Sequence, residues 1–121
     1  MNKTVAPSYT ARTSAFATAT GITDTTILGA LNTFDLGLIS NSLDTKMKAV
    51  YPFVGGTSST HKFNFMSAVD SDAAFRLNFS GGMTHSSNGI LFNGTNGWAD
   101  TRLIPLTSLS LNSSHASIYS R

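Results

Sequence analysis

The chain has 121 residues and a formal net charge of +2, and this length supports one hydrophobic core. Only 12% of the residues are charged, about half the fraction of an average soluble domain. Cysteine is absent and the cations are scattered along the chain, which excludes a disulfide framework, a thiolate metal site and a clustered basic footprint for nucleic acid.

Residues 1–22 are predicted to form an extended N-terminal anchor. They are rich in Thr, Ser and Ala, and they contain two isolated aromatic residues, Tyr9 and Phe16. So little apolar surface cannot offset the ordering entropy of an isolated segment. The segment is therefore either a disordered tail or a chain that becomes ordered along another subunit, with Tyr9 and Phe16 as its contacts. It has no continuous apolar run, so we expect neither a secretory signal nor membrane insertion.

Residues 23–48 are predicted to form a helical collar. Thr23 or Asp24 can cap a helix, and its apolar residues recur at helical spacing: Ile27, Leu31, Phe34 and Leu38. A second short helix is predicted to begin at Asn41 or Ser42, and its apolar residues continue the stripe: Leu43, Met47 and Val50. The stripe predicts one buried face. That face packs in the core of the chain or, in an assembly, against a neighbouring subunit.

From residue 49 to residue 121 the apolar period becomes alternating, which predicts the first part of an antiparallel β-sandwich. The predicted strands span residues 50–54, 61–65, 75–79, 90–92, 97–103 and 114–120. Their alternation places five side chains on buried faces: Phe63, Phe65, Phe75, Leu77 and Phe79. Pro52 confines the first strand to an edge or a bulge, and the glycine pairs at 55–56 and 81–82 predict turns. The predicted fold class is mainly β with an N-terminal helical segment.

Four short phrases carry a family resemblance that runs from about Ala15 to Arg121. They are VYPFVGG at 50–56, DAAFRL at 72–77, NGTNG at 93–97 and SIYSR at 117–121. In this order they resemble the opening half of a concanavalin A-like (laminin-G-like) jelly-roll module that recurs in structural and fibre proteins of tailed bacteriophages. The resemblance implies a tail, collar or fibre protein of the extracellular phage particle, with other virion proteins as partners and a homo-oligomeric state.

The number of predicted strands bears on how the module is completed. A jelly roll needs about eight strands in two sheets, whereas the sequence offers five or six. We expect either that the sequence is the N-terminal portion of a longer fibre protein, which we favour, or that another subunit completes the sheets. An exposed last strand would otherwise be an edge prone to aggregation.

Catalytic patterns are weak, and the sequence predicts no enzyme, no cofactor and no metal site. His61, His85 and His115 lie on different predicted segments, and we interpret each as a surface or network histidine. Asp70 and Asp72 could bind Ca²⁺ together with backbone oxygens, but a solvated turn with Asx hydrogen bonds is the favoured interpretation. A depolymerase would need two facing carboxylates, and it ranks third among the functions.

The second function to consider is a carbohydrate-binding adhesin that recognises a host surface glycan. Trp98 can stack on a sugar ring while Asn96 and Asp100 bind its hydroxyls. The competing interpretation packs Trp98 into the sandwich and pairs Asp100 with Arg102. The glycines of the 93–97 phrase also predict a turn, because glycine adopts positive φ at little cost.

Overall fold

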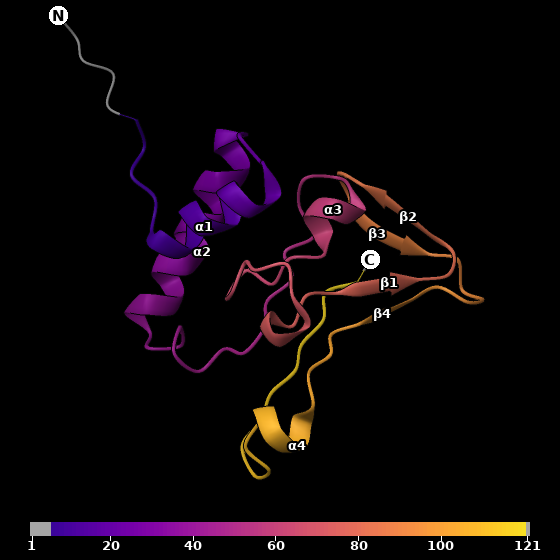
Figure 1. Cartoon of the computed structure of the whole chain (residues 1–121). Helices are drawn as coiled ribbons and strands as arrows, with labels where there is room; N and C mark the ends of the chain where they lie inside the picture. The colour runs from indigo at the N-terminus through magenta and orange to yellow at the C-terminus, as the bar shows by residue number, and fades with distance from the viewer. Residues whose placement is uncertain (1–5, 121) are drawn as a thin grey trace, which may run out of the picture.

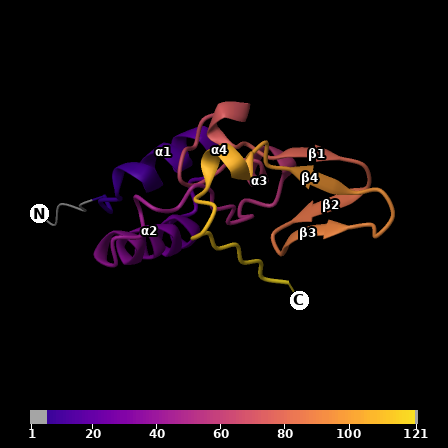
Figure 2. The same cartoon turned by 90° about the horizontal axis from the view of Figure 1, so that it is seen from below.

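The computed structural model describes residues 6–120, so residues 1–5 of the predicted anchor and the last residue of the predicted sandwich lie outside the described residues. Helices and short antiparallel strands make a mixed fold, with α1 and α2 at one end, the strands at the other and α3 between them (Figures 1 and 2). The elements are α1 (Ala11–Thr20), α2 (Thr25–Ser40), α3 (Ser58–His61), η1 (Asp72–Ala74), β1 (Asn78–Ser80), β2 (Met83–Ser86), β3 (Gly89–Phe92), β4 (Trp98–Asp100) and α4 (Pro105–Ser108).

Helix α1 corrects the prediction that residues 1–22 are extended. The Thr10 hydroxyl caps its first turn by accepting a backbone N–H at 3.2 Å. Gly21 ends it with φ at 73°, a left-handed conformation that glycine adopts without a steric penalty. A helix this short depends on tertiary packing, and here the fully buried Phe16 supplies it. The helix therefore folds against its own chain.

Helix α2 begins at the predicted cap, because the Asp24 carboxylate accepts two backbone N–H groups at 2.8 and 3.3 Å. Its buried face differs from the predicted stripe and consists of Leu28, Leu31, Asp35 and Leu38. Phe34 remains 41% exposed. The face is rotated because Asp35 pairs with Arg12 of α1 and so takes the inward position that the apolar pattern assigned to Phe34.

The second helix predicted from Asn41 or Ser42 does not form. Asn41 caps the end of α2, and its side-chain amide donates to the Gly37 carbonyl at 2.8 Å. Ser42 has φ at 54°, and this left-handed backbone interrupts the helical repeat. Residues 41–46 form turns instead. The predicted collar therefore contributes one helix, α2, which packs against α1.

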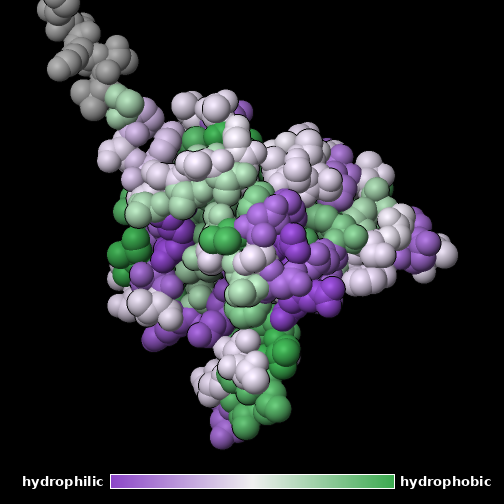
Figure 3. Space-filling model, in the orientation of Figure 1, coloured by the Kyte–Doolittle hydropathy of each residue, from purple (hydrophilic) through white to green (hydrophobic). Residues whose placement is uncertain are grey.

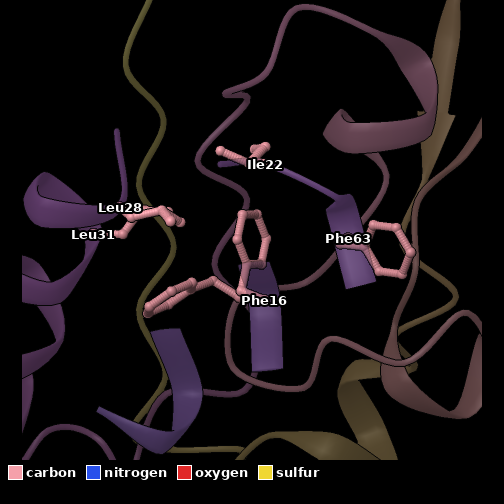
Figure 4. Close-up of a cluster of buried hydrophobic side chains, with 6 residues drawn as sticks. Phe16, Ile22, Leu28, Leu31 and Phe63 are labelled. Atoms are coloured by element: carbon pink, nitrogen blue, oxygen red, sulfur yellow. The ribbon is translucent and has the colours of Figure 1, made fainter. Parts of the chain in front are cut away.

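The core lies between α1, α2 and residues 63–65 (Figure 4). Its buried members are Phe16, Ile22, Leu28, Leu31, Phe63 and Phe65. The rings of Phe16 and Phe65 meet edge to face, with centroids 5.4 Å apart, a geometry favoured by the quadrupole of the aromatic ring. Burying a side chain of this size contributes about 1.5–3 kcal/mol. The predicted burial of Phe63 and Phe65 is confirmed.

The prediction of strands at residues 50–54 and 61–65 is wrong, although side chains of both segments pack in or against the core. Asn64 is 1% exposed, and its amide makes four hydrogen bonds of 2.9–3.1 Å to backbone groups. The partners belong to Lys48, Val50, Met66 and Ala74. The bonds to Lys48 and Val50, together with the bond from the Phe65 N–H to the Val50 carbonyl at 2.8 Å, join the two segments in place of a strand ladder. His61 belongs to α3.

The strands form two antiparallel pairs, β1 with β4 and β2 with β3. The β2–β3 hairpin is nested in the sequence between β1 and β4 (Figure 2). In the outer pair, Asn78 lies opposite Asp100 and Ser80 lies opposite Trp98. Within residues 6–120 each sheet has two strands, so a jelly-roll sandwich is not confirmed.

The other strand predictions have mixed outcomes. The strand at 90–92 is confirmed within β3, and the one at 97–103 is confirmed only as β4. The strand at 75–79 begins only at Asn78, because Phe75 has φ at 57° and its carbonyl accepts the Tyr51 hydroxyl at 2.6 Å. Strand β2 was not predicted. Residues 114–120 have no strand partner among the described residues.

The chain bends at both predicted glycine pairs. At Gly81, φ is 78°, and a Cβ atom would lie 1.9 Å from the carbonyl oxygen of Asn96. Only glycine can therefore occupy this position, where the β1–β2 connection passes against the β3–β4 connection.

Candidate functional site

The exposed indole of Trp98 lies on the outer strand pair. Trp98 and Asp100 are alternate residues of β4, so their side chains share one face of the strand pair. Their cross-strand partners, Ser80 and Asn78, lie on the same face. Trp98 is 53% exposed, and the prediction that it packs into a sandwich is wrong. The face combines an aromatic surface with hydroxyl, amide and carboxylate groups.

Asn96 does not belong to this face. Its side-chain carbonyl accepts the Gly82 N–H at 3.1 Å and the Asn93 amide at 2.7 Å. Asn93 in turn accepts the N–H groups of three following residues, each at 3.1 Å. Both side chains therefore build the turn predicted for residues 93–97. Asn78, which the sequence did not indicate, takes the place beside Asp100.

A chain of alternating charges leads up to Asp100. Its order is Lys62, Asp70, Arg76, Asp72, Arg102 and Asp100, and the successive N–O distances are 2.6, 2.9, 2.8, 4.0 and 3.4 Å. Three cations and three carboxylates alternate, so this row of six side chains has no net charge. The predicted pairing of Asp100 with Arg102 is confirmed.

Asp70 and Asp72 have different partners from those predicted. Hydrogen bonds from Lys62 and Arg76 lower the pKa of Asp70, and hydrogen bonds from Arg76 and Asn78 lower the pKa of Asp72. Their carboxylates thus bind side chains of other segments rather than the backbone of an Asx turn. Among residues 6–120 no three His or Asp side chains are grouped closely enough to hold a metal ion.

The predicted anchor residues mostly serve the core of the chain itself. Phe16 and Leu31 are buried in it, and Tyr9 and Ile27 pack against it. Only Phe34 keeps an exposed ring. A set of partly exposed apolar side chains lies on α2 and the turn after it: Phe34, Leu36, Ile39, Leu43 and Met47. Leu36 and Ile39 are three residues apart and share one side of α2, which we call the α2 outer surface, whereas Phe34 faces another side of the helix.

A second apolar surface lies on residues 101–120, which we call the C-terminal arm. The arm carries α4 away from the body (Figure 1), and the lobe around α4 is largely hydrophobic (Figure 3). Five large apolar side chains on it are 61–91% exposed: Ile104, Leu106, Leu111, Ile118 and Tyr119. The sequence pattern had placed residues 114–120 in a strand, which would bury one of its faces.

His61 and His85 meet in the interior, although the sequence gave no reason to pair them. Their Nδ1 atoms are 2.9 Å apart, and His61 is 1% exposed. The rings of Phe53 and Phe79 pack against the pair, with centroid distances of 6.0 Å to His61 and 4.8 Å to His85. Burial and the neighbouring His85 lower the pKa of His61. His115 is exposed on the C-terminal arm.

A groove of about 660 Å³ lies next to this pair of histidines. It is bounded by the start of α2, by residues 54–60 and by Ser87 at the tip of the β2–β3 hairpin. Most of its lining is small and polar, and its one carboxylate, Asp24, already caps α2. The residues that line the groove therefore offer no unpaired charged group that would select a particular ligand.

No helix in the described part of the chain has the length and apolar character needed to cross a membrane. No known protein family, curated protein or solved structure compared with the chain matches it.

Proposed function

We propose that the chain is a structural component of a tailed-phage virion, a tail, collar or fibre protein that acts by assembly and display. The resemblance of its four phrases to a module of such proteins supports this proposal. Its partners would be other virion proteins and further copies of the chain, and it would need neither a catalytic residue nor a cofactor. Its location would be the phage particle.

The observation that carries the proposal is the exposure of the C-terminal arm. Burying apolar surface stabilises a complex by about 25 cal/mol per Å², so the five exposed apolar side chains of the arm would favour its association with another surface. Residues 114–120 have no regular secondary structure and lack a strand partner among the described residues. Such a segment can add to the edge of another sheet. In the proposed assembly, added strands of this kind complete the jelly-roll sandwich.

The α2 outer surface is the proposed contact with the rest of the virion. It replaces the extended anchor, because α1 folds onto α2 and buries Phe16. Its exposed side chains are Leu36 and Ile39, so none of the predicted anchor residues belongs to it. This arrangement leaves the strands free to point away from the docking side, as Figure 1 shows.

The oligomeric state tests the role of the arm. Light scattering after size-exclusion chromatography should show an oligomer for the native chain and a monomer for the double variant Leu111→Asp/Ile118→Asp. Leu91→Asp is the matched control, because Leu91 is equally exposed on the separate β2–β3 hairpin. A native chain that remains monomeric at every concentration would remove the arm from the proposal.

The location has its own test. An antibody raised against the purified chain should label intact phage particles purified from the lysate of the strain that encodes it. Absence of the chain from purified particles, judged by the same antibody after denaturation, would overturn the proposal.

A second candidate function is the binding of a host glycan by the Trp98 face. The half-exposed indole beside Ser80, Asn78 and Asp100 favours it, because sugars stack on indoles and bind such polar groups. The adjoining chain of paired charges has no net charge, which favours a neutral saccharide over an acidic one. Trp98→Ala should abolish retention on an immobilised neutral polysaccharide, whereas Leu91→Ala should not. If the native chain assembles but no saccharide retains it, this candidate is removed.

A further inference from the structure

The hydrogen bond between His61 and His85 connects two parts of the molecule that otherwise share few polar contacts. His61 ends α3, which packs beside the core, and His85 lies in the middle of β2. Among the hydrogen bonds of the described residues, this is the one that joins hairpin residues 83–92 to the chain before β1. The hairpin is otherwise held by its neighbours in sequence and by ring packing. We propose that the His61–His85 pair is an acid-sensitive latch that holds the β2–β3 hairpin against α3.

The geometry of the pair restricts its protonation. The two Nδ1 atoms are 2.9 Å apart, so one must donate a proton while the other accepts through its lone pair. At least one of the two rings must therefore present an unprotonated Nδ1. If both rings become imidazolium, two N–H groups and two positive charges face each other at this distance, and the bond is lost.

The surroundings offer nothing to stabilise a second charge. The segments packed around the pair are residues 51–57, α3, β1, β2 and β3, and none of them contains Asp, Lys or Arg. Their remaining ionisable group, Tyr51, donates its hydroxyl to a backbone carbonyl at 2.6 Å and stays neutral. The next residue, Lys62, directs its ammonium group to Asp70 at 2.6 Å. Since His61 is almost fully buried, water cannot solvate the added charge either.

Release of the latch has a defined structural consequence. Ser87, at the tip of the hairpin, lines the groove next to Gly56, where a Cβ atom would lie 3.5 Å from the Ser87 backbone nitrogen. When both histidines are protonated, the hairpin moves away from α3 and this side of the groove opens. The β2–β3 ladder and the core contain no other histidine, so both persist.

The sign of the pH dependence follows from burial. Because burial and the neighbouring His85 lower the pKa of His61, the native chain binds less proton at His61 than the unfolded chain does. The latch is therefore complete above the ordinary histidine pKa of about 6.5 and weakens as the pH falls below it.

The test is an NMR titration of the full chain from about pH 8 to about pH 4, across the range in which histidine titrates. Amide signals of residues 83–92 should change together with the ring signals of His61, with a midpoint below the ordinary histidine pKa of about 6.5. Amide protection in the hairpin, corrected for intrinsic exchange, should fall severalfold as the hairpin opens. The signals of α1 and α2 should remain unchanged.

Two variants complete the design. His85→Gln retains a hydrogen-bonding group that does not titrate, and it should abolish the transition in residues 83–92. His115→Ala removes the exposed histidine and should leave the transition intact. Hairpin signals of the native chain that stay constant over the whole range would overturn the proposal, and so would a transition that persists in His85→Gln. The native titration decides the question even if His85→Gln does not fold.

Discussion

Arg12 on α1 forms an ion pair with Asp35 on α2, and the Asp35 side chain is almost completely buried. The pair crosses the interface of the two helices next to the apolar core. A buried ion pair specifies how two elements align more clearly than it stabilises them, because both charges must leave water. We infer that the pair fixes the register in which α1 packs on α2.

Removing one partner of this pair should be costly. Arg12→Met leaves the Asp35 carboxylate buried without compensation and should lower the free energy of unfolding by about 2–4 kcal/mol. The double variant Arg12→Met/Asp35→Leu should recover most of this loss. Urea unfolding measures both changes. Arg102→Met, in an exposed ion pair, should cost less than about 1 kcal/mol. A similar cost for Arg12→Met and Arg102→Met would contradict the prediction.

Asn64 should be among the most sensitive polar positions. Asn64→Leu keeps the volume but removes four hydrogen bonds to backbone groups. Each donor or acceptor left buried without a partner costs about 1–3 kcal/mol, and some of these groups can reach water. We expect a loss of at least about 3 kcal/mol in urea unfolding. The exposed Asn112→Ala should change stability by less than about 0.5 kcal/mol, and equal effects at both positions would refute the role of Asn64.

Substitutions at Gly81 and Gly94 distinguish the cost of backbone strain from the cost of a steric clash. Both have a left-handed backbone, with φ at 78° and 73°, but a Cβ atom would clash only at Gly81. Gly94→Ala should cost about 1–2 kcal/mol, the penalty of this conformation for alanine. Gly81→Ala should cost at least about 2 kcal/mol more, since it creates a backbone clash. Thermal unfolding of the two variants gives the comparison, and equal losses would show that the clash relaxes freely.

Tyr51 should govern stability at alkaline pH. Burial raises its pKa from 10.0 to about 12, so the folded state retains the phenolic proton where the unfolded state loses it. Its contribution is therefore complete below about pH 10 and is lost as the pH rises through about 12. Phenolate absorbance during an alkaline titration should show one late-ionising tyrosine, which Tyr51→Phe removes. If the late step remains in Tyr51→Phe, the assignment is wrong.

Local signals in the sequence predicted part of the fold. The Asp24 cap, helix α2, the two glycine bends and the burial of Phe63 and Phe65 follow from short-range chemistry. Helix α1 was missed because Phe16 is its one large apolar residue and forms no helical stripe, although four of its ten residues are alanine. Its stability comes from contacts that Phe16 makes with Phe65, far along the chain. No local pattern contains that contact.

Side chains that replace backbone hydrogen bonds explain the missed strands. Alternating apolar residues normally predict a ladder, but at 61–65 the polar residue between the two phenylalanines points inward. Asn64 then satisfies the backbone groups that a neighbouring strand would have satisfied. An alternating pattern does not reveal which of its polar residues is buried.

Only part of the candidate site could be predicted from the sequence. Trp98 and Asp100 share a face because they are two residues apart, and this proximity could be predicted. Asn78 joins them through the register of β1 with β4, which sequence spacing does not determine. His61 and His85 are 24 residues apart on different elements. No local signal pairs them, and only the fold brings them together.

The nesting of the β2–β3 hairpin between β1 and β4 has a consequence for the order of folding. Its two-residue turn lets β2 and β3 meet within microseconds, on the order of 1–10 μs for an isolated hairpin. Once formed, the hairpin shortens the free loop that must close before β1 reaches β4, and so lowers the entropic cost of that closure. We expect the inner pair to form first and the outer pair to close around it. Lengthening the turn at Ser87 should therefore slow the formation of both pairs.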